Sequence, residues 1–263
     1  MAHLEQLFGL TGQRAIVTGA SSGLGVQAAR ALAKGGADLG LVARRADRLE
    51  ALAAELADEF GVRACAAPAD VTDSAALAAA FEQVEKELGP LDILLGSAGI
   101  AELGRAERHK REKWDRVLAV NLTAAFESSQ IMARKLIERG RPGRIIHISS
   151  AIGSGGNPVH RAVGYSAAKA GLDNLVRHLA VEWAQHGILV NAIAPSYFPT
   201  EMTVDPEIGD VRADQKEIMH RFTPLGRLGR EGELETAVLF LTAPASTYVT
   251  GTVIPVDGGW TAW

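Results

Sequence analysis

Tyr165 and Lys169 are the two residues of this chain whose types and spacing most directly suggest proton-transfer chemistry. They lie four positions apart in a stretch with a helical pattern, which places both side chains on one face of the helix. A tyrosine with a pKa near ~10 is a poor base and a reluctant acid at neutral pH. An ammonium ~4 Å away stabilises the phenolate by about 1 kcal/mol in water and by about 4 kcal/mol at an effective dielectric constant of ~20. The pair therefore predicts acid–base chemistry in a site that excludes water; the alternative is an ordinary contact between an aromatic ring and a lysine.

Three polar residues upstream extend this candidate site. Ser149 ends the apolar run Arg144–Ser149, and Ser150 follows it at the edge of the predicted sheet where ligands bind. The Ser150 hydroxyl could donate to a substrate carbonyl oxygen, whereas capping of the next turn is the alternative for either serine. Asn121 lies between two helical stretches, where it could hold a water that links Lys169 to solvent or simply make an internal backbone contact.

A glycine-rich turn follows the first apolar run. In Thr18–Gly25, Gly19 allows a tight turn, Gly23 lets the backbone approach a pyrophosphate, and Gly25 allows close packing of helix on strand. The helix that follows presents free N–H groups to phosphates. The glycines are spaced differently from the usual dinucleotide fingerprint, and a glycine-rich turn without a ligand is the alternative. Its place between a strand and a helix favours a dinucleotide site.

The residues after the next two predicted strands refine this site. Arg44 and Arg45 follow the second strand, where an acidic residue would bind a ribose 2′-hydroxyl and an arginine accommodates a 2′-phosphate. Solvated loop charges are the alternative for both. Asp70 is expected to end the third strand, in Ala69–Val71, where it could accept a hydrogen bond from an adenine amino group or cap the next turn.

The elements that must position these groups alternate regularly along the chain. Short, almost continuously apolar runs are typical of strands buried on both faces; they are Arg14–Thr18, Asp38–Ala43, Leu91–Leu95, Arg144–Ser149 and Ile188–Ala194. Helical stretches such as Ala46–Phe60 and Ser74–Leu88 lie between them, the second with an apolar stripe and with Asp73 as its N-cap. This rhythm predicts an α/β fold with a doubly wound parallel sheet and helices on both faces, in one domain over residues 1–263. The loop-like segment 196–225 interrupts the rhythm and is expected to form a helical lid over a substrate site; a surface insertion without a role is the alternative.

Composition excludes several classes of function. The 263 residues carry a formal net charge of −4, which argues against a protein that binds nucleic-acid backbones. A single cysteine, Cys65, and seven histidines without ligand spacing predict neither a disulfide nor a metal site. No signal peptide and no membrane-spanning run is apparent. We therefore expect a cytoplasmic enzyme with a small-molecule substrate.

Together these motifs resemble the short-chain dehydrogenase/reductase family over nearly the whole chain. The residues that carry the resemblance are the glycine-rich turn, Asn121, Ser150, the Tyr165–Lys169 motif and the terminal Val256–Trp260. It implies a Rossmann-like domain, commonly a homotetramer, with Asn121, Ser150, Tyr165 and Lys169 as the catalytic residues. Tyr165 would be the general acid/base, Ser150 would polarise the carbonyl, and Lys169 would lower the tyrosine pKa and hold the nicotinamide ribose.

The resemblance also implies a cofactor, with NADP(H) preferred over NAD(H) because Arg44 directly follows the family's acidic position. The cofactor-binding residues are then expected to be Gly19, Ser21, Ser22, Gly23, Leu24, Gly25, Arg44, Arg45, Asp70, Val71, Ala98, Gly99, Tyr165, Lys169, Pro195 and Thr200.

The chain departs from the family pattern at three places. The usual Asn-Asn-Ala-Gly is Gly96–Gly99 here, and the usual Pro-Gly after the sixth strand is Pro195–Ser196. Ser150 and Tyr165 are 15 positions apart, slightly more than is usual, and the longer loop 153–161 is expected to alter specificity more than chemistry.

Within the family, Leu7–Ala20, Phe198–Thr203 and Val256–Trp263 look like the branch of gluconate 5-dehydrogenases and 3-oxoacyl-carrier-protein reductases. A sugar acid or another small carbonyl compound is the expected substrate, and a 3-oxoacyl-carrier-protein substrate is an alternative. Arg105, Arg161 and His160 are candidate substrate contacts, whereas His147 is expected to be a hydrogen-bonded core residue. A non-catalytic dinucleotide-binding regulator is the alternative from another class, against which the intact Ser150, Tyr165 and Lys169 argue.

Overall fold

The computed structural model describes residues 2–156, 159–205 and 207–263. Within them, one sheet has the strand order β3-β2-β1-β4-β5-β6-β7, and every neighbouring pair is parallel. The strands are β1 Arg14–Thr18, β2 Asp38–Ala43, β3 Ala64–Pro68, β4 Ile93–Gly96, β5 Gly143–Ile148, β6 Ile188–Pro195 and β7 Val253–Val256. The predicted parallel sheet is confirmed.

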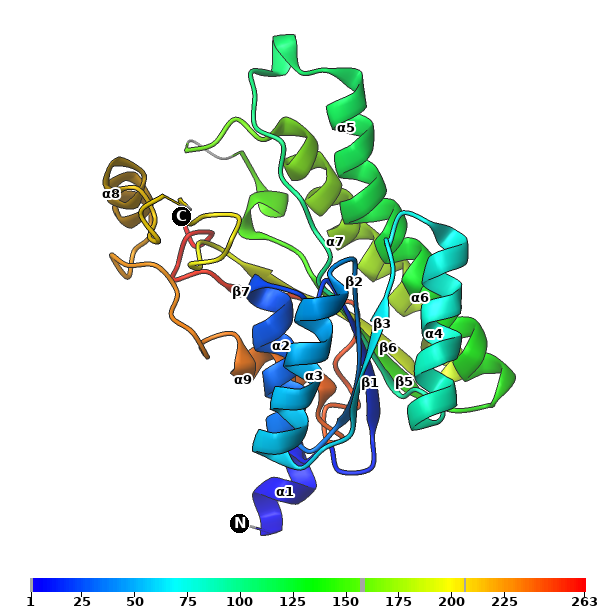
Figure 1. Ribbon diagram of the computed structural model, residues 1–263. Helices are drawn as coiled ribbons and strands as arrows, with labels where there is room; N and C mark the ends of the chain where they lie inside the picture. The colour runs from blue at the N-terminus through cyan, green and yellow to red at the C-terminus, as the bar shows by residue number, and fades with distance from the viewer. Residues whose placement is uncertain (1, 157–158, 206) are drawn as a thin grey trace.

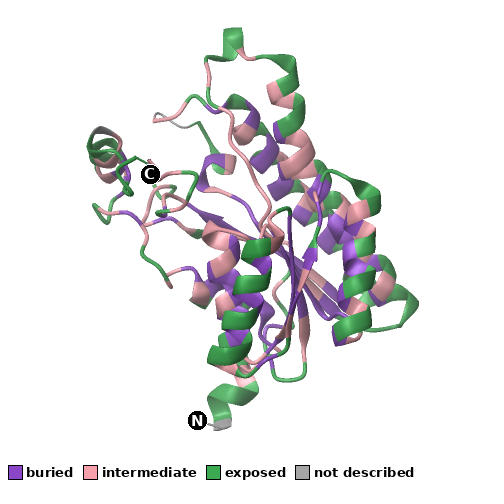
Figure 2. Ribbon diagram, in the orientation of Figure 1, coloured by how far each residue is buried: buried purple, intermediate pink, exposed green. Residues whose placement is uncertain are grey.

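Helices cover both faces of this sheet (Figure 1). One face packs against α2 Gly23–Lys34, α3 Ala46–Phe60 and α9 Glu235–Thr242. The other packs against α4 Ser74–Leu88, α6 Ala124–Glu138 and α7 Val163–Trp183. Figure 2 shows that the buried residues lie along the strands and on the helix faces turned toward them. Burial on both faces is the physical reason for the continuous apolar runs in the strand sequences.

The remaining elements are shorter. They are α1 Ala2–Phe8, η1 Ala106–Arg108, α5 Arg111–Leu118, η2 Ala119–Thr123, η3 Ala151–Ser154, η4 Ala184–His186 and α8 Ala213–Phe222. In the part of the chain that the structure describes, no helix is long and apolar enough to span a membrane. No cluster of three or more metal-ligating side chains occurs among those same residues.

The local predictions for α4 are confirmed. Its apolar stripe, which includes Leu77 and Phe81, is buried in the sheet core. The Asp73 carboxylate caps the helix by accepting from the backbone N–H groups of Ala75 and Ala76, each at 3.0 Å.

The prediction that Asp70 ends the third strand is wrong. β3 ends at Pro68, and Asp70 lies in the turn that follows. Its Oδ1 accepts from the backbone N–H of Thr72 at 2.9 Å and from the Thr72 hydroxyl at 2.8 Å. These bonds form a side-chain turn, which confirms the capping role of Asp70; its adenine contact stays a prediction.

The centre of the sheet contains its topological switch point. β1 pairs with β2 on one side and with β4 on the other, with Thr18 opposite Gly96. The chain leaves β1 for α2, on one face of the sheet. Ligands of open α/β sheets bind in the crevice beyond the carboxyl ends of the strands at such a point.

The segment 196–225 contains one α-helix among its described residues and is otherwise irregular, so it is less helical than predicted. α8 lies within it and contributes Met219 to a small apolar cluster with Val211 and Leu228. Figure 1 places α8 beside the C-terminal end of the chain, away from the helices that cover the sheet. Pro206, one of the prolines of this segment, lies outside the described residues.

Candidate active site

Ser150 and Tyr165 meet beyond the carboxyl end of β5. Ser150 precedes η3, and its Oγ accepts from the backbone N–H of Ile152 at 3.4 Å. The Tyr165 side chain, from the first turn of α7, hydrogen-bonds to that of Ser150. The serine therefore both caps a turn and faces the tyrosine, so the two readings of Ser150 do not exclude one another.

Lys169 lies one turn further along α7, and its side chain is 3% exposed. Its Nζ donates to the carbonyl oxygen of Ile148 at 2.7 Å and lies 5.6 Å from the centre of the Tyr165 ring. Lys169 is therefore shielded from bulk solvent, as the argument from dielectric constant required.

Burial dominates the electrostatics of the pair. Burial lowers the pKa of Lys169 from 10.5 to about 8, against the opposing influence of Asp173. Burial also raises the pKa of Tyr165 above its ordinary value, although the hydrogen bond with Ser150 opposes this shift. Lys169 is not among the causes of this shift, and the lowering of the tyrosine pKa by Lys169 stays a prediction for the site with cofactor bound.

Asn121 occupies a π-helical turn, η2, that joins α5 to α6 without a break. Such turns are frequent at functional sites. The Asn121 Nδ2 donates to the carbonyl oxygens of Ile100 at 2.8 Å and Val117 at 2.9 Å. Its Oδ1 is buried without a hydrogen-bond partner among the described residues. Asn121 thus makes the predicted internal contacts to the backbone through Nδ2, while its Oδ1 remains able to accept a hydrogen bond.

Four polar side chains lie behind the catalytic pair, and sequence reasoning gave no expectation for two of them, Asp173 and Ser129. The Ser149 hydroxyl donates to the buried Asp173 carboxylate, whose pKa is raised by burial. Asp173 is four residues after Lys169, a spacing from which their contact was predictable. Ser129 bonds to His147 at 2.7 Å, but His147 Nδ1 has no partner among the described residues, so the expected hydrogen-bonded histidine is confirmed at one ring nitrogen only.

The glycine-rich turn has the geometry that a dinucleotide site requires. Gly19 has a φ of +72°, and a Cβ there would lie 2.5 Å from the backbone nitrogen of Ala98. A Cβ on Gly25 would lie 2.1 Å from the carbonyl oxygen of Gly19. These contacts match the turn and packing roles predicted for the two glycines. Ser21 and Ser22 lie in the turn, and α2 begins at Gly23 and continues through Leu24, with its first N–H groups directed out of the helix.

The arginines after β2 form a charged cluster with this turn. Arg45 donates to the Ser21 hydroxyl at 3.0 Å and pairs with Glu201 at 3.1 Å. Arg48 also pairs with Glu201, and these arginines lower the pKa of that carboxyl to about 2. Arg44 is exposed at the same edge of the sheet. The sequence showed the basic pair but not its acidic partner, which is 156 positions away from Arg45.

The other predicted cofactor residues border the same crevice. Val71 and Ala98 line a small cavity beside Asn121, and a Cβ on Gly99 would lie 2.9 Å from the Asn121 Oδ1. Pro195 ends β6. The Thr200 side chain lies 3.2 Å from the position of a Cβ on Gly23, so the start of the segment 196–225 approaches the glycine-rich turn.

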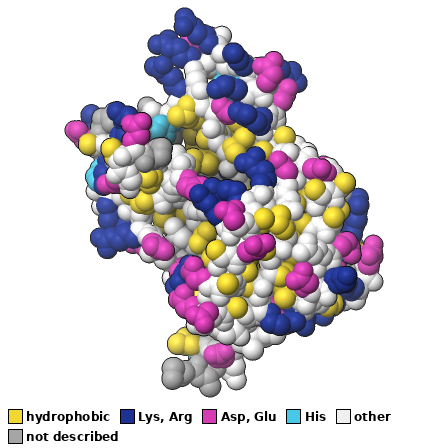
Figure 3. Space-filling model, viewed as in Figure 1, with side chains coloured by type: hydrophobic (Ala, Val, Ile, Leu, Met, Phe, Trp, Pro, Cys, Tyr) yellow, Lys and Arg dark blue, Asp and Glu magenta, His cyan; other side chains and the backbone are white. Residues whose placement is uncertain are grey.

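A larger cavity of about 370 Å³ opens beside Ser150 and Tyr165. Its other walls include His160, Tyr197, Arg212, Met219 and Trp260. The rings of Tyr197 and Trp260 meet edge to face, with centroids 5.1 Å apart. Figure 3 shows this side of the molecule hollowed, with hydrophobic side chains in the hollow and basic side chains at its rim.

Of the three predicted substrate contacts, His160 lines this cavity, whereas Arg105 and Arg161 are not among its lining residues. Arg105 pairs with Glu107 at 3.7 Å, and Arg161 is exposed. Arg212, from the segment 196–225, is the basic residue that lines the cavity instead. Residues 157 and 158 of the longer loop lie outside the described residues.

Known proteins match this chain over almost its full length. A family model described as enoyl-(acyl carrier protein) reductase matches residues 19–261. A galactitol 2-dehydrogenase (L-tagatose-forming) from Cereibacter sphaeroides is 41% identical over 261 residues, or 98% of each chain. Among solved structures, a short-chain type dehydrogenase/reductase from Mycobacterium marinum has a TM-score of 0.92 at 35% identity, covering 98% of this chain and 99% of that one.

A second structure is that of a gluconate 5-dehydrogenase from Burkholderia cenocepacia J2315, in complex with NADP and tartrate. It has a TM-score of 0.91 at 34% identity and covers 99% of this chain and 100% of that one. The predicted branch of the family is therefore confirmed together with the predicted fold. With its Rossmann-like sheet and its full-length relatives, the chain belongs to the short-chain dehydrogenase/reductase family and is an oxidoreductase that acts on CH–OH and C=O groups.

Proposed function

We propose that this enzyme interconverts a ketone and a secondary alcohol with NADP(H), and that Tyr165 is its general acid/base. The observation that carries the proposal is the pairing of Ser150 with Tyr165 on the wall of the 370 Å³ cavity, with Lys169 buried behind them. A substrate carbonyl in that cavity would meet two hydroxyl donors.

In the direction of reduction, the chemistry needs one hydride at the carbonyl carbon and one proton at its oxygen. The cofactor supplies the hydride when it is bound. Ser150 polarises the carbonyl through its hydroxyl, and Tyr165 donates the proton. Tyr165 is protonated at neutral pH and can therefore donate, although burial raises its pKa and so opposes proton release, against the hydrogen bond with Ser150. Lys169 and Asn121 support the tyrosine from the protein side of the site.

The preference for NADP(H) is proposed from the residues around the glycine-rich turn. The position before Arg44 is Ala43, so no carboxylate follows β2 to bind a ribose 2′-hydroxyl. Arg44 and Arg45 offer planar guanidinium groups for a 2′-phosphate. The turn itself fits the pyrophosphate, since Gly19 and Gly25 have no space for a side chain. The NADP complex of the Burkholderia relative supports the same choice.

For the substrate, we propose a sugar acid or another small polyhydroxy ketone. The names of the galactitol and gluconate dehydrogenases support this class. Arg212 and Gln215 line the cavity and provide polar groups at its far side, where Arg212 also pairs with Asp205 at 3.3 Å. A 3-oxoacyl-carrier-protein substrate is the second candidate; it shares the acyl carrier protein, though not the reacting group, with the description of the matching family model.

A panel of ketones assayed with both cofactors tests this function. We expect NADPH oxidation with 5-keto-gluconate or a keto-hexose to exceed that with a 3-oxoacyl thioester by at least about tenfold in kcat/KM, a difference of about 1.4 kcal/mol. A higher kcat/KM with the thioester would favour the second candidate. Cofactor binding without turnover of any ketone would instead favour the non-catalytic alternative.

We further propose that residues 1–263 form one catalytic domain, with the segment 196–225 as its lid, and that the enzyme is a cytoplasmic homotetramer, as is common in the family. Sedimentation equilibrium measures the assembly directly. A mass of one or two chains of 27.8 kDa would contradict the tetramer.

A further inference from the structure

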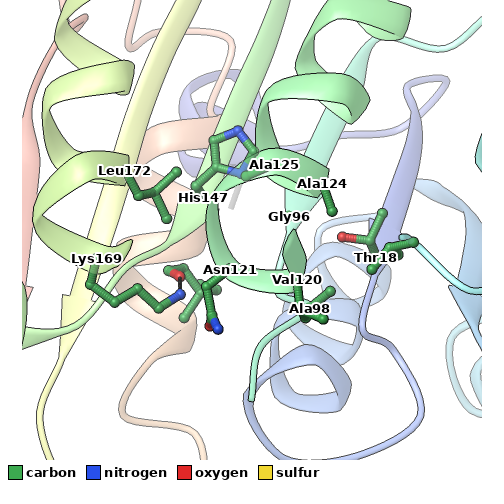
Figure 4. Close-up of a pocket in the computed structure, with 12 residues that line it drawn as sticks. Thr18, Gly96, Ala98, Val120, Asn121, Ala124, Ala125, His147, Lys169 and Leu172 are labelled. Carbon is green, nitrogen blue, oxygen red and sulfur yellow. Dashed lines mark hydrogen bonds between the residues drawn. The ribbon is translucent and has the colours of Figure 1, made fainter. Parts of the chain in front are cut away.

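A second, much smaller cavity lies behind Lys169 on the core side of the site. Its volume is about 10 Å³, which is about the space that one water molecule needs. Figure 4 shows Lys169, Asn121 and His147 arranged around it, with Gly96 and Thr18 on the opposite side. Asn121 and Lys169 already have proposed roles, whereas His147 has none.

The hydrogen bonds of His147 determine which of its ring nitrogens carries a proton. The Ser129 hydroxyl donates its single proton to the carbonyl oxygen of Ala125, at 2.7 Å. It must therefore accept from His147 Nε2, which lies 2.7 Å away. The ring is neutral, because burial, together with the nearby Lys169, lowers its pKa to about 3. His147 Nδ1 is then a bare acceptor, and it has no partner among the described residues.

Asn121 contributes a second bare acceptor to the same cavity. Its amide orientation is fixed, because Nδ2 donates to the two carbonyl oxygens of Ile100 and Val117. Asn121 Oδ1 is buried without a partner among the residues described. Lys169 supplies donors, since only one of its three N–H groups is used by the Ile148 carbonyl. A water molecule suits a cavity lined in this way, because it can donate to a bare acceptor and accept from an ammonium.

The sequence around Gly96 shows why His147 fits here. Gly96 pairs with His147 across β4 and β5, and a Cβ on Gly96 would lie 2.3 Å from His147 Nδ1. Gly96 occupies the position at which the family pattern has its first asparagine. The imidazole thus occupies space that a side chain at position 96 would need, and it brings its own acceptor to the cavity.

We propose that His147, oriented by Ser129, is a positioning residue for proton transfer: its Nδ1 holds a water in the cavity that Asn121 and Lys169 also line. This inference rests on the proposed function of Tyr165 and Lys169. The titratable groups that face Lys169 are Tyr165 and Asp173 on its own helix and His147 on β5. Loss of the His147 acceptor should therefore destabilise the charged form of Lys169. It should leave the relative placement of cofactor and substrate unchanged.

The sharpest test compares two adjacent serines. Ser129→Ala removes the acceptor that fixes the His147 tautomer, whereas Ser128→Ala removes a hydroxyl that donates to the same Ala125 carbonyl at 3.1 Å and has no bond to His147. We expect Ser129→Ala to lower kcat about tenfold, a fraction of what acid–base catalysis contributes, with the Kd for NADPH unchanged. Ser128→Ala should retain the kcat of the wild type.

His147 itself is tested with two substitutions. His147→Leu should lower kcat and move the alkaline limb of the kcat pH profile to lower pH by about one unit, because the Lys169 ammonium is less well supported. His147→Asn, which restores a side-chain oxygen as acceptor, should return both the rate and the limb toward those of the wild type. If His147→Leu does not fold, the Ser129→Ala and Ser128→Ala comparison decides.

Wild-type kcat and pH profile in both His147→Leu and Ser129→Ala would overturn the inference. So would equal losses in Ser129→Ala and Ser128→Ala, since these would reflect packing alone. Tyr165→Phe, assayed in the same series, separates this inference from the proposed function. An active Tyr165→Phe refutes the function, whereas an inactive one with fully active His147 variants refutes only the role of His147.

Discussion

Lys169 should make the protein less stable at neutral pH than it would be with an apolar residue at that position. Burial lowers its pKa from 10.5 to about 8. Between these two values the unfolded state binds more protons than the folded state, so stability rises as the pH rises. The full effect is about 3 kcal/mol at pH 7, of which about 1 kcal/mol remains at pH 9.5. Lys169→Met removes this titration.

Urea unfolding of the protein without cofactor, at these two pH values and one protein concentration, measures the effect. We expect the wild type to gain about 2 kcal/mol relative to Lys169→Met between about pH 7 and pH 9.5. Lys135→Met is the matched control. Burial opposes the charge of Lys135, but hydrogen bonds with Glu82 and Glu85 raise its pKa, so Lys135 stays protonated in both states over this range. An equal pH dependence in the two variants, or the same pH dependence in the wild type and in Lys169→Met, would refute the reasoning.

Three further predictions concern the cofactor site. Gly19→Ala should destabilise the protein by about 1–3 kcal/mol more than Gly12→Ala, as measured by thermal unfolding. Both glycines have a positive φ, but only a Cβ at position 19 meets the backbone of Ala98. Equal losses of stability in the two variants would contradict this. Arg44→Asp should shift the NADPH/NADH ratio of kcat/KM toward NADH by about tenfold or more, and an unchanged ratio would exclude Arg44 as the phosphate contact. Glu201→Gln should lower the Kd for NADPH and not for NADH, because it releases Arg45 from an ion pair; equal changes for both cofactors in a fluorescence titration would contradict this reading.

The fold was predictable because its determinants are local in sequence. Strands buried on both faces need continuous apolar runs, and β1, β2 and β6 have them. The Ala-rich β3 offers no β-branched residues, which is why its end was placed two residues too late, at Asp70. The third strand lies at the edge of the sheet, where Pro68 is tolerated at its end.

The positions of site residues were predictable where the residues of a motif lie on one helix or strand. They were not predictable where residues from two distant elements come into contact. Tyr165 and Lys169 share a helix, so their spacing placed them on one face. The pairing of Arg45 with Glu201 depends on how the segment 196–225 folds back onto the glycine-rich turn. The pairing of His147 with Ser129 depends on the packing of α6 against β5. Such pairs arise from tertiary structure and have no signature in sequence spacing.

Single-turnover NADPH oxidation by Tyr165→Phe, alongside a measured Kd for NADPH, tests the central claim most directly. The substitution removes one hydroxyl and keeps the ring over which Lys169 lies. We predict an unchanged Kd and a rate of hydride transfer to the ketone lower by about 10²-fold or more. A variant that binds NADPH normally and retains the wild-type rate would show that Tyr165 is not the acid.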